Sequence, residues 1–156
     1  MKAIHFAGAA LVLATFGLTA CGDEPAPAET VDPRTMEGIT ITEARMVLPA
    51  VSGHPAAVYF TATNDSDKEA GIRTVDVGGA KSAMLHNTTD GEMVDVMVAQ
   101  VPAGGELKFE PGAYHVMAMD LDPTLAAGGT TDVTIHYSNG KKSTFPAEIR
   151  AAGDER

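Results

Sequence analysis

His115 and Met117 are separated by a single residue, within a segment (114–119) whose alternating pattern predicts a β-strand. Side chains two positions apart on a strand point to the same face, so an imidazole nitrogen and a thioether sulfur would lie side by side. A half-buried histidine beside a core methionine gives the same pattern in many β-proteins. The pair therefore indicates a metal site only if further ligands face it.

A second group of such residues surrounds Asp90-Gly91, a dipeptide that favours a two-residue hairpin turn because both residues accept positive φ angles. Antiparallel pairing around this turn predicts His86 opposite Asp95, Met84 opposite Met97, and Met93 diagonal to His86. Met84, His86, Met93 and Met97 would then share one face. Imidazole and thioether ligands without thiolate or carboxylate favour Cu(I) over Mg(II), Ca(II) and Zn(II).

Short alternating segments separated by turn residues continue through the chain from residue 39. No helical stripe or internal repeat stands out in that part of the sequence. We therefore predict an all-β fold, a Greek-key antiparallel β-sandwich. The expected strands are 39–41, 58–63, 72–77, 82–86, 92–98, 106–109, 114–119, 132–137 and 142–149.

The first residues have the features of an export signal, with Lys2 followed by an apolar stretch too short to span a bilayer comfortably. Leu18-Thr19-Ala20-Cys21 resembles the lipobox of bacterial lipoproteins, which implies lipidation of Cys21. We expect a signal peptide over 1–20, a lipidated Cys and a flexible Pro/Ala/acidic tether over 21–38, the β-sandwich domain over 39–151 and a tail over 152–156. This predicts an extracytoplasmic protein held at a membrane by its lipid anchor alone.

Composition excludes several classes of function. The formal net charge is -10, so the phosphate backbone of a nucleic acid would repel the chain. Cys21 is the only cysteine, which leaves the domain without the thiolate that a blue-copper electron carrier needs. Gly-x-Ser-x-Gly and His-Glu-x-x-His motifs are absent, so we do not expect an enzyme.

Five segments together resemble the periplasmic copper chaperones called PCuAC, over roughly residues 39 to 137. They are Asn64 after the strand of Tyr59, Met84-Leu85-His86, Asp90-Gly91, Pro102-Ala103-Gly104-Gly105, and the most specific, residues 111–121 with Tyr114-His115-Val116-Met117. The resemblance implies a cupredoxin-like fold and a Cu(I) site of two His and two Met. It also implies delivery of copper to a cytochrome oxidase subunit, often alongside a Sco-type partner.

The resemblance carries over directly to His86, His115 and Met117, whereas the fourth ligand is open. Family members space their ligands as a His, ten residues, a Met and twenty-one residues before His-x-Met. Here ten residues separate His86 from Met97, and twenty-one residues separate Met93 from His115. The hairpin favours Met93, near the exposed turn; Met97 is the alternative ligand and would otherwise pack against Met84.

The remaining candidates have weaker support. Met84 and Met119 share the expected faces and are possible alternative ligands, and His54 is a possible accessory ligand from a loop. The alternation around His136 predicts a solvated side chain. Two other functions stay open: a copper-buffering or resistance protein, and an adhesion or scaffold sandwich in which the methionines only pack.

Overall fold

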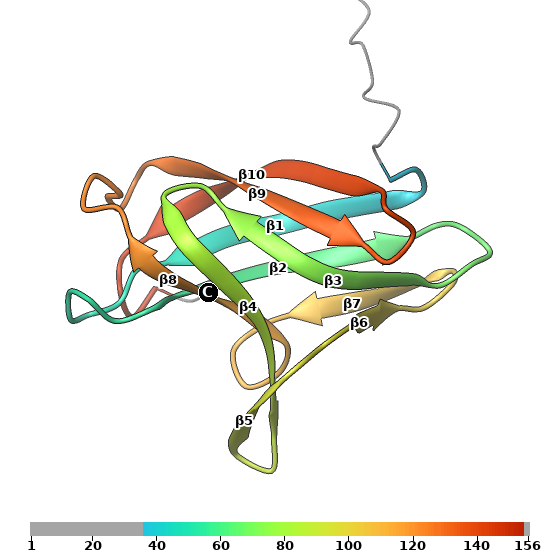
Figure 1. Cartoon of the computed structure of the whole chain (residues 1–156), viewed down its shortest axis with the longest axis horizontal. Helices are drawn as coiled ribbons and strands as arrows, with labels where there is room; N and C mark the ends of the chain where they lie inside the picture. Colours follow the sequence, from blue (N-terminus) through green and yellow to red (C-terminus); the bar gives the residue numbers. More distant parts are fainter. Residues whose placement is uncertain (1–35, 155–156) are drawn as a thin grey trace, which may run out of the picture. The chain divides into compact units, whose positions relative to one another are not determined.

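The computed structural model describes residues 36–154, which form strands and no helix (Figure 1). Residues 1–35 and 155–156, which hold Cys21, the expected leader and most of the expected tether, lie outside the described residues. The strands are β1 (Ile39–Val47), β2 (Ala56–Asn64), β3 (Ala70–Val77), β4 (Ala80–Thr89), β5 (Glu92–Asp95), β6 (Ala99–Val101), β7 (Gly105–Phe109), β8 (His115–Leu121), β9 (Thr130–Tyr137) and β10 (Lys142–Arg150). In this range no helix is long and apolar enough to cross a membrane.

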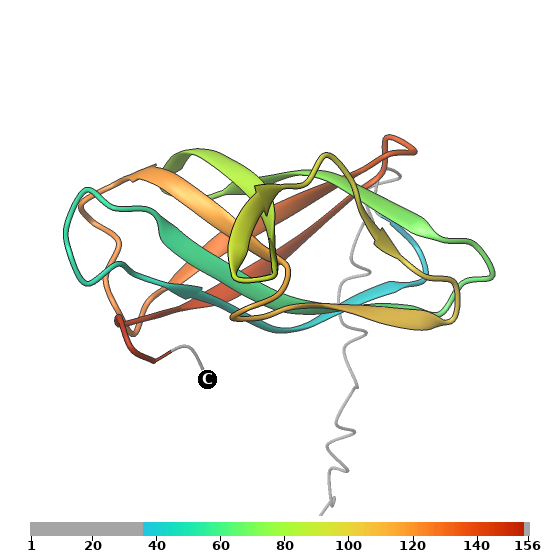
Figure 2. The ribbon, with the colours of Figure 1, turned by 90° about the horizontal axis from the view of Figure 1, so that it is seen from below.

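One hydrogen-bonded path joins the strands in the order β5-β4-β8-β2-β1-β10-β9-β3-β6, and β7 lies beside β8 on the same edge of β2. Every strand pairing in it is antiparallel except that of β1 with β10. Seen from below, β1, β2 and β7 lie along one side and β3 along the other (Figure 2). The prediction of an all-β sandwich is confirmed.

The core lies between these strands and holds apolar side chains from all of them except β5. β9 shows why the sequence folds this way, because its buried and less buried residues alternate along the strand. Phe60 of β2 stacks on Phe109 of β7 at a centroid distance of 4.2 Å. Met46 is fully buried, and Met36, near the end of the expected tether, also packs against the core.

The Asp90-Gly91 turn is confirmed. Asp90 has a φ of 53° and Gly91 a φ of 83°, the two positive angles that a two-residue hairpin of this type requires. Thr89 therefore pairs with Glu92, and the register continues to His86 opposite Asp95 as expected. The other Asx-Gly pair behaves differently: Tyr137 pairs its N–H with the Lys141 carbonyl, so three residues form that loop, and of Asn139-Gly140 only the glycine has positive φ.

The expected strand 92–98 is wrong beyond Asp95. The Val96 N–H still donates to the Leu85 carbonyl at 2.9 Å, after which the chain bends at Met97 and enters the separate strand β6. Ala99 and Val101 cause the change, because both are buried in the core beside β3 whereas β5 is exposed along its length. Met97 consequently lies outside the ladder and is not paired with Met84 as expected.

Candidate metal centre

The two halves of the predicted ligand set meet on the β4–β8 ladder. His86 pairs directly with His115, and Met84 pairs directly with Met117. Directly opposed residues of an antiparallel ladder project from the same face. The pairing therefore brings both histidines and two methionines together. Local sequence gave no sign of it, because the two strands are adjacent only through the long-range topology.

The imidazole rings are close enough to share an ion. Their centroids are 5.8 Å apart and their planes differ by 26°. Two rings bound to one ion through bonds of about 2 Å have centroids within roughly 6 Å of each other. The His115 ring is buried and that of His86 nearly so, which limits access of water to the space between them.

In each ring, one nitrogen is hydrogen-bonded to an oxygen and the other nitrogen has no hydrogen bond. Nε2 of His86 lies 2.9 Å from Oδ1 of Asp95, and Nδ1 of His115 lies 2.9 Å from the Ala113 carbonyl oxygen. Nδ1 of His86 is buried and has no partner, and it is the only such side-chain nitrogen or oxygen in residues 36–154. A buried polar atom without a partner is costly, so it points to a missing ligand.

Several methionines share the face of the histidine pair. Met117 is half-buried beside His115, and Met84 opposite it is more exposed. Met93 lies on β5 opposite Thr88, which makes it diagonal to His86, and its side chain is 56% exposed. Met119 faces Ser82 two residues further along β8. The structure thus brings four candidate sulfurs to this face.

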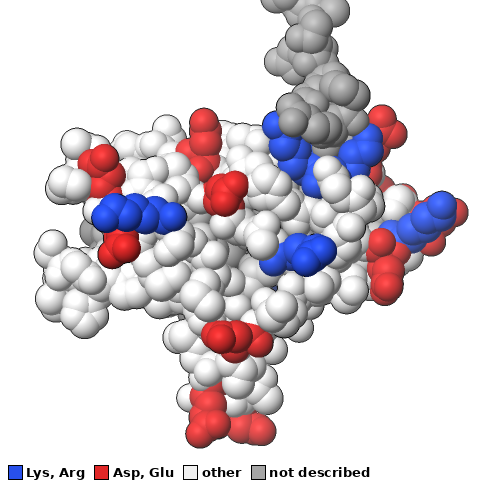
Figure 3. All heavy atoms as spheres, viewed as in Figure 1, with Lys and Arg blue, Asp and Glu red and all other residues white. Residues whose placement is uncertain are grey.

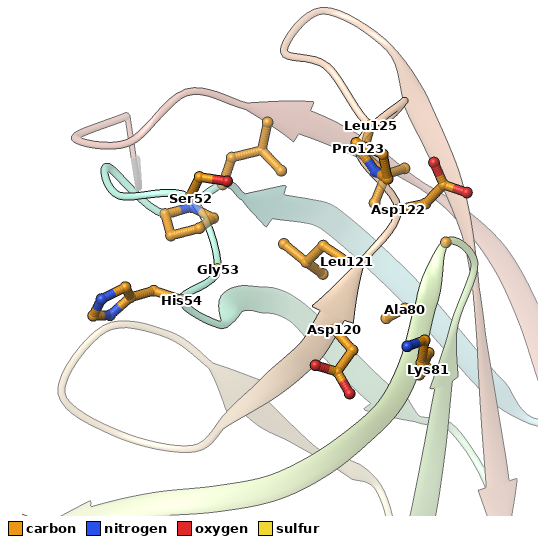
Figure 4. Close-up of a pocket in the computed structure, with 13 residues that line it drawn as sticks. Ser52, Gly53, His54, Ala80, Lys81, Asp120, Leu121, Asp122, Pro123 and Leu125 are labelled. Atoms are coloured by element: carbon orange, nitrogen blue, oxygen red, sulfur yellow. The ribbon is translucent and has the colours of Figure 1, made fainter.

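Two of the weaker candidates lie outside the strand pairings that contain the histidines. Met97 lies in the bend after β5 and is 83% exposed, so the packing role expected for it against Met84 is wrong. His54 lines a pocket of about 840 Å³ with Asp120 and Asp122, beside the end of β8 that is remote from His115. In Figure 4 its ring points away from the labelled carboxylates.

The donor side chains near the pair limit which metal ions the site can bind. No group of three His, Cys, Asp or Glu side chains in residues 36–154 could hold a metal ion. The soft donors that share the face of the histidine pair are thioether sulfurs, which Mg(II), Ca(II) and Zn(II) disfavour. His136 is partly exposed and its Nε2 lies 2.8 Å from Asp76, consistent with the solvated position predicted for it.

Asp95 is the residue of this site to which sequence analysis gave no role. The predicted hairpin register placed it opposite His86, and that was the available signal, since a carboxylate one strand away from an imidazole can accept its N–H. A carboxylate is not a soft ligand, so a donor set chosen for Cu(I) does not include it. Its side chain is 73% exposed and its contact with His86 is made at the surface.

The fold defines a class of protein. The structure is similar to the copper-bound PCuAC domain from PmoF2, with a TM-score of 0.64 and 18% identity over 73% of this chain and 93% of that one. It is also similar to the Cu(I) form of DR1885 from Deinococcus radiodurans, with a TM-score of 0.64 and 26% identity over 83% of this chain and 89% of that one. The protein thus has the cupredoxin-like fold of the PCuAC domains.

Sequence relatives then place the chain in a particular family. Residues 39–149 match the family described as "Putative lipoprotein LpqE-like". The chain is also 30% identical over 140 residues to "Putative lipoprotein Lxx21020" of Leifsonia xyli subsp. xyli (strain CTCB07), covering 86% of this chain and 82% of that one. The chain belongs to the LpqE-like lipoprotein family.

Proposed function

We propose that this protein is an extracytoplasmic Cu(I) metallochaperone, tethered to a membrane through lipidated Cys21. It holds the ion with His86, His115, Met117 and a fourth ligand, Met93. The observation that carries the proposal is the direct pairing of His86 with His115 on the β4–β8 ladder, where Nδ1 of His86 is buried without a partner and methionines share the face. Family membership and the resemblance to copper-bound PCuAC domains support it.

The chemistry of the donor set selects the oxidation state. Thioether sulfur is a soft ligand and imidazole a borderline one, a combination that suits Cu(I). A bound ion would be held by neutral ligands, because the carboxylate nearest to the pair, Asp95, is engaged with His86 Nε2. We therefore expect weak binding of Zn(II) and tight binding of one Cu(I).

The surroundings of the site favour transfer to another protein. Of the six exposed large hydrophobic side chains in residues 36–154, five lie between residues 84 and 98, on the β4–β5 hairpin and the bend that follows it. Residues 82–98 carry Asp90, Glu92 and Asp95 and no Lys or Arg. Carboxylates accordingly gather on the projecting hairpin in Figure 3. An apolar surface with an acidic rim suits a partner with an apolar centre and basic rim.

Copper binding is tested by titrating the protein with Cu(I) under reducing conditions against a Cu(I) chelator of known affinity. His86→Gln should weaken binding by at least tenfold. His136→Gln is the matched control, because His136 also has an Asp bonded to Nε2 but lies away from the site. Equal affinities for wild type and His86→Gln, or no stoichiometric uptake, would contradict the proposal.

Delivery is tested by mixing the Cu(I)-loaded protein with a Sco-type domain or the copper-binding domain of a cytochrome oxidase subunit. We expect transfer that slows with ionic strength and in the double variant Asp90→Asn/Glu92→Gln, because charge attraction accelerates encounter. Asp65→Asn/Asp67→Asn removes the same charge from the exposed loop after β2 and should transfer faster than the hairpin variant. Tight binding without transfer to either acceptor would favour copper buffering.

A further inference from the structure

The two histidine rings are oriented by different hydrogen bonds, which bears on how each ring would bind a metal. A neutral imidazole has one N–H and one nitrogen lone pair, and the hydrogen bond made by one nitrogen decides which nitrogen can bind a metal. In this site the two rings use opposite nitrogens for their hydrogen bonds. The following inference deepens the proposed function and rests on it.

The tautomer of His86 follows from its contact with Asp95. A carboxylate only accepts hydrogen bonds, so at 2.9 Å the Nε2 atom of His86 must carry the proton. The lone pair then lies on Nδ1, the buried atom without a partner. Asp95 is on β5 and His115 on β8, which flank β4 on opposite sides. The ring is thus hydrogen-bonded on one side and has the second imidazole on the other.

The tautomer of His115 is the reverse. Its Nδ1 lies 2.9 Å from the Ala113 carbonyl oxygen, which also only accepts, so Nδ1 carries the proton and Nε2 carries the lone pair. The acceptor here is backbone, two residues away in the same chain segment, and no side-chain substitution removes it. His115 is therefore oriented by the backbone, whereas His86 is oriented by one side chain.

We propose that His86 binds Cu(I) through Nδ1 and His115 through Nε2, and that Asp95 is the positioning residue that enforces this choice. Without Asp95, the proton of His86 can move to Nδ1, and the ring can turn to present either nitrogen. Outer hydrogen-bond partners of this kind contribute about 10–100-fold to metal affinity. Because Asp95 is largely exposed, we expect the lower end, a loss of about tenfold in Asp95→Ala.

The test is long-range ¹H–¹⁵N correlation of the histidine rings in the apo and Cu(I)-loaded protein; Cu(I) is diamagnetic and leaves the signals sharp. The apo protein should show His86 protonated on Nε2, and Asp95→Ala should show mixed tautomers. Asp95→Asn keeps an oxygen acceptor, so it should restore the tautomer and most of the affinity. Asp76→Ala, which removes the equivalent partner of His136, should leave His86 and the Cu(I) affinity unchanged.

In the loaded protein, the metal-induced ¹⁵N shift should appear on Nδ1 of His86 and on Nε2 of His115. A shift on Nε2 of His86, or an Asp95→Ala variant with unchanged tautomer and affinity, would overturn the inference. Failure of the proposed function looks different: the wild type would take up no Cu(I), while the apo spectrum would still report the His86 tautomer.

Discussion

Met93→Leu tests how the fourth copper ligand is chosen. Two spacings in the sequence disagree about that ligand: ten residues separate His86 from Met97, and twenty-one residues separate Met93 from His115. The structure places Met93 on the site face of β5, opposite Thr88 and diagonal to His86, whereas Met97 is beyond the end of β5 in the following bend. We expect Met93→Leu to weaken Cu(I) binding and Met97→Leu to leave it unchanged.

The magnitudes follow from exposure and chemistry. Met93 is 56% exposed and leucine nearly preserves its volume, so the free energy of unfolding should change by less than about 0.5 kcal/mol. A directly bound sulfur should contribute at least as much as an outer hydrogen-bond partner, which is about 10–100-fold in affinity. That range corresponds to about 1.4–2.8 kcal/mol of binding free energy. The loss in binding should therefore greatly exceed the loss in stability.

Competition titrations with a Cu(I) chelator, run beside thermal melts, measure both quantities on the same samples. Met84→Leu completes the series, because Met84 lies directly opposite Met117 and is the other sulfur able to take the fourth position. A loss of affinity confined to Met84→Leu would move the ligand to β4. A loss confined to Met97→Leu would show that the ten-residue spacing identifies the ligand and that the bend closes over the metal.

Three further changes probe other parts of the molecule. Cys21→Ser should move the protein from the membrane fraction to the soluble extracytoplasmic fraction with copper binding intact, and a variant still in the membrane would contradict lipidation. Gly91→Ala should destabilise the fold by about 1 kcal/mol in denaturant titrations because φ is 83° with open space around it; an unchanged midpoint would mean that the turn is not strained. Burial raises the pKa of the Tyr137 hydroxyl, so the hydroxyl ionises in the unfolded chain first, and the free energy of unfolding should fall as pH rises above about 10. Tyr137→Phe should reduce this alkaline loss of stability. Identical alkaline stability profiles for the two proteins would refute the assignment.

Local patterns predicted most of the strands and the hairpin on which the site depends. Alternation of apolar and polar residues indicates a strand because one face of each strand is buried. Asp90-Gly91 sets the register of the β4–β5 hairpin, because few residues accept two consecutive positive φ angles. That register places Met93 and Asp95 relative to His86 from local sequence alone. The hairpin register could not show that β5 ends at Asp95, because that end is determined by the burial of Ala99 and Val101 beside β3.

The direct opposition of His86 and His115 was beyond the reach of local sequence. It depends on β8 entering the sheet between β4 and β2, a non-local pairing determined by the whole core. Family resemblance supplied the two histidines as ligands but not their register. The tautomers were likewise inaccessible, since they depend on which oxygen lies within hydrogen-bond distance of each ring.

The central claim is that Cu(I) is held by imidazole nitrogen and thioether sulfur together. X-ray absorption at the copper edge of the protein loaded with one equivalent of Cu(I) tests it most directly, because sulfur and nitrogen neighbours differ in distance and scattering. We predict a mixed shell in which sulfur neighbours diminish in Met93→Leu and nitrogen neighbours diminish in His86→Gln. A shell of oxygen and nitrogen alone, or a spectrum that neither variant changes, would contradict the claim.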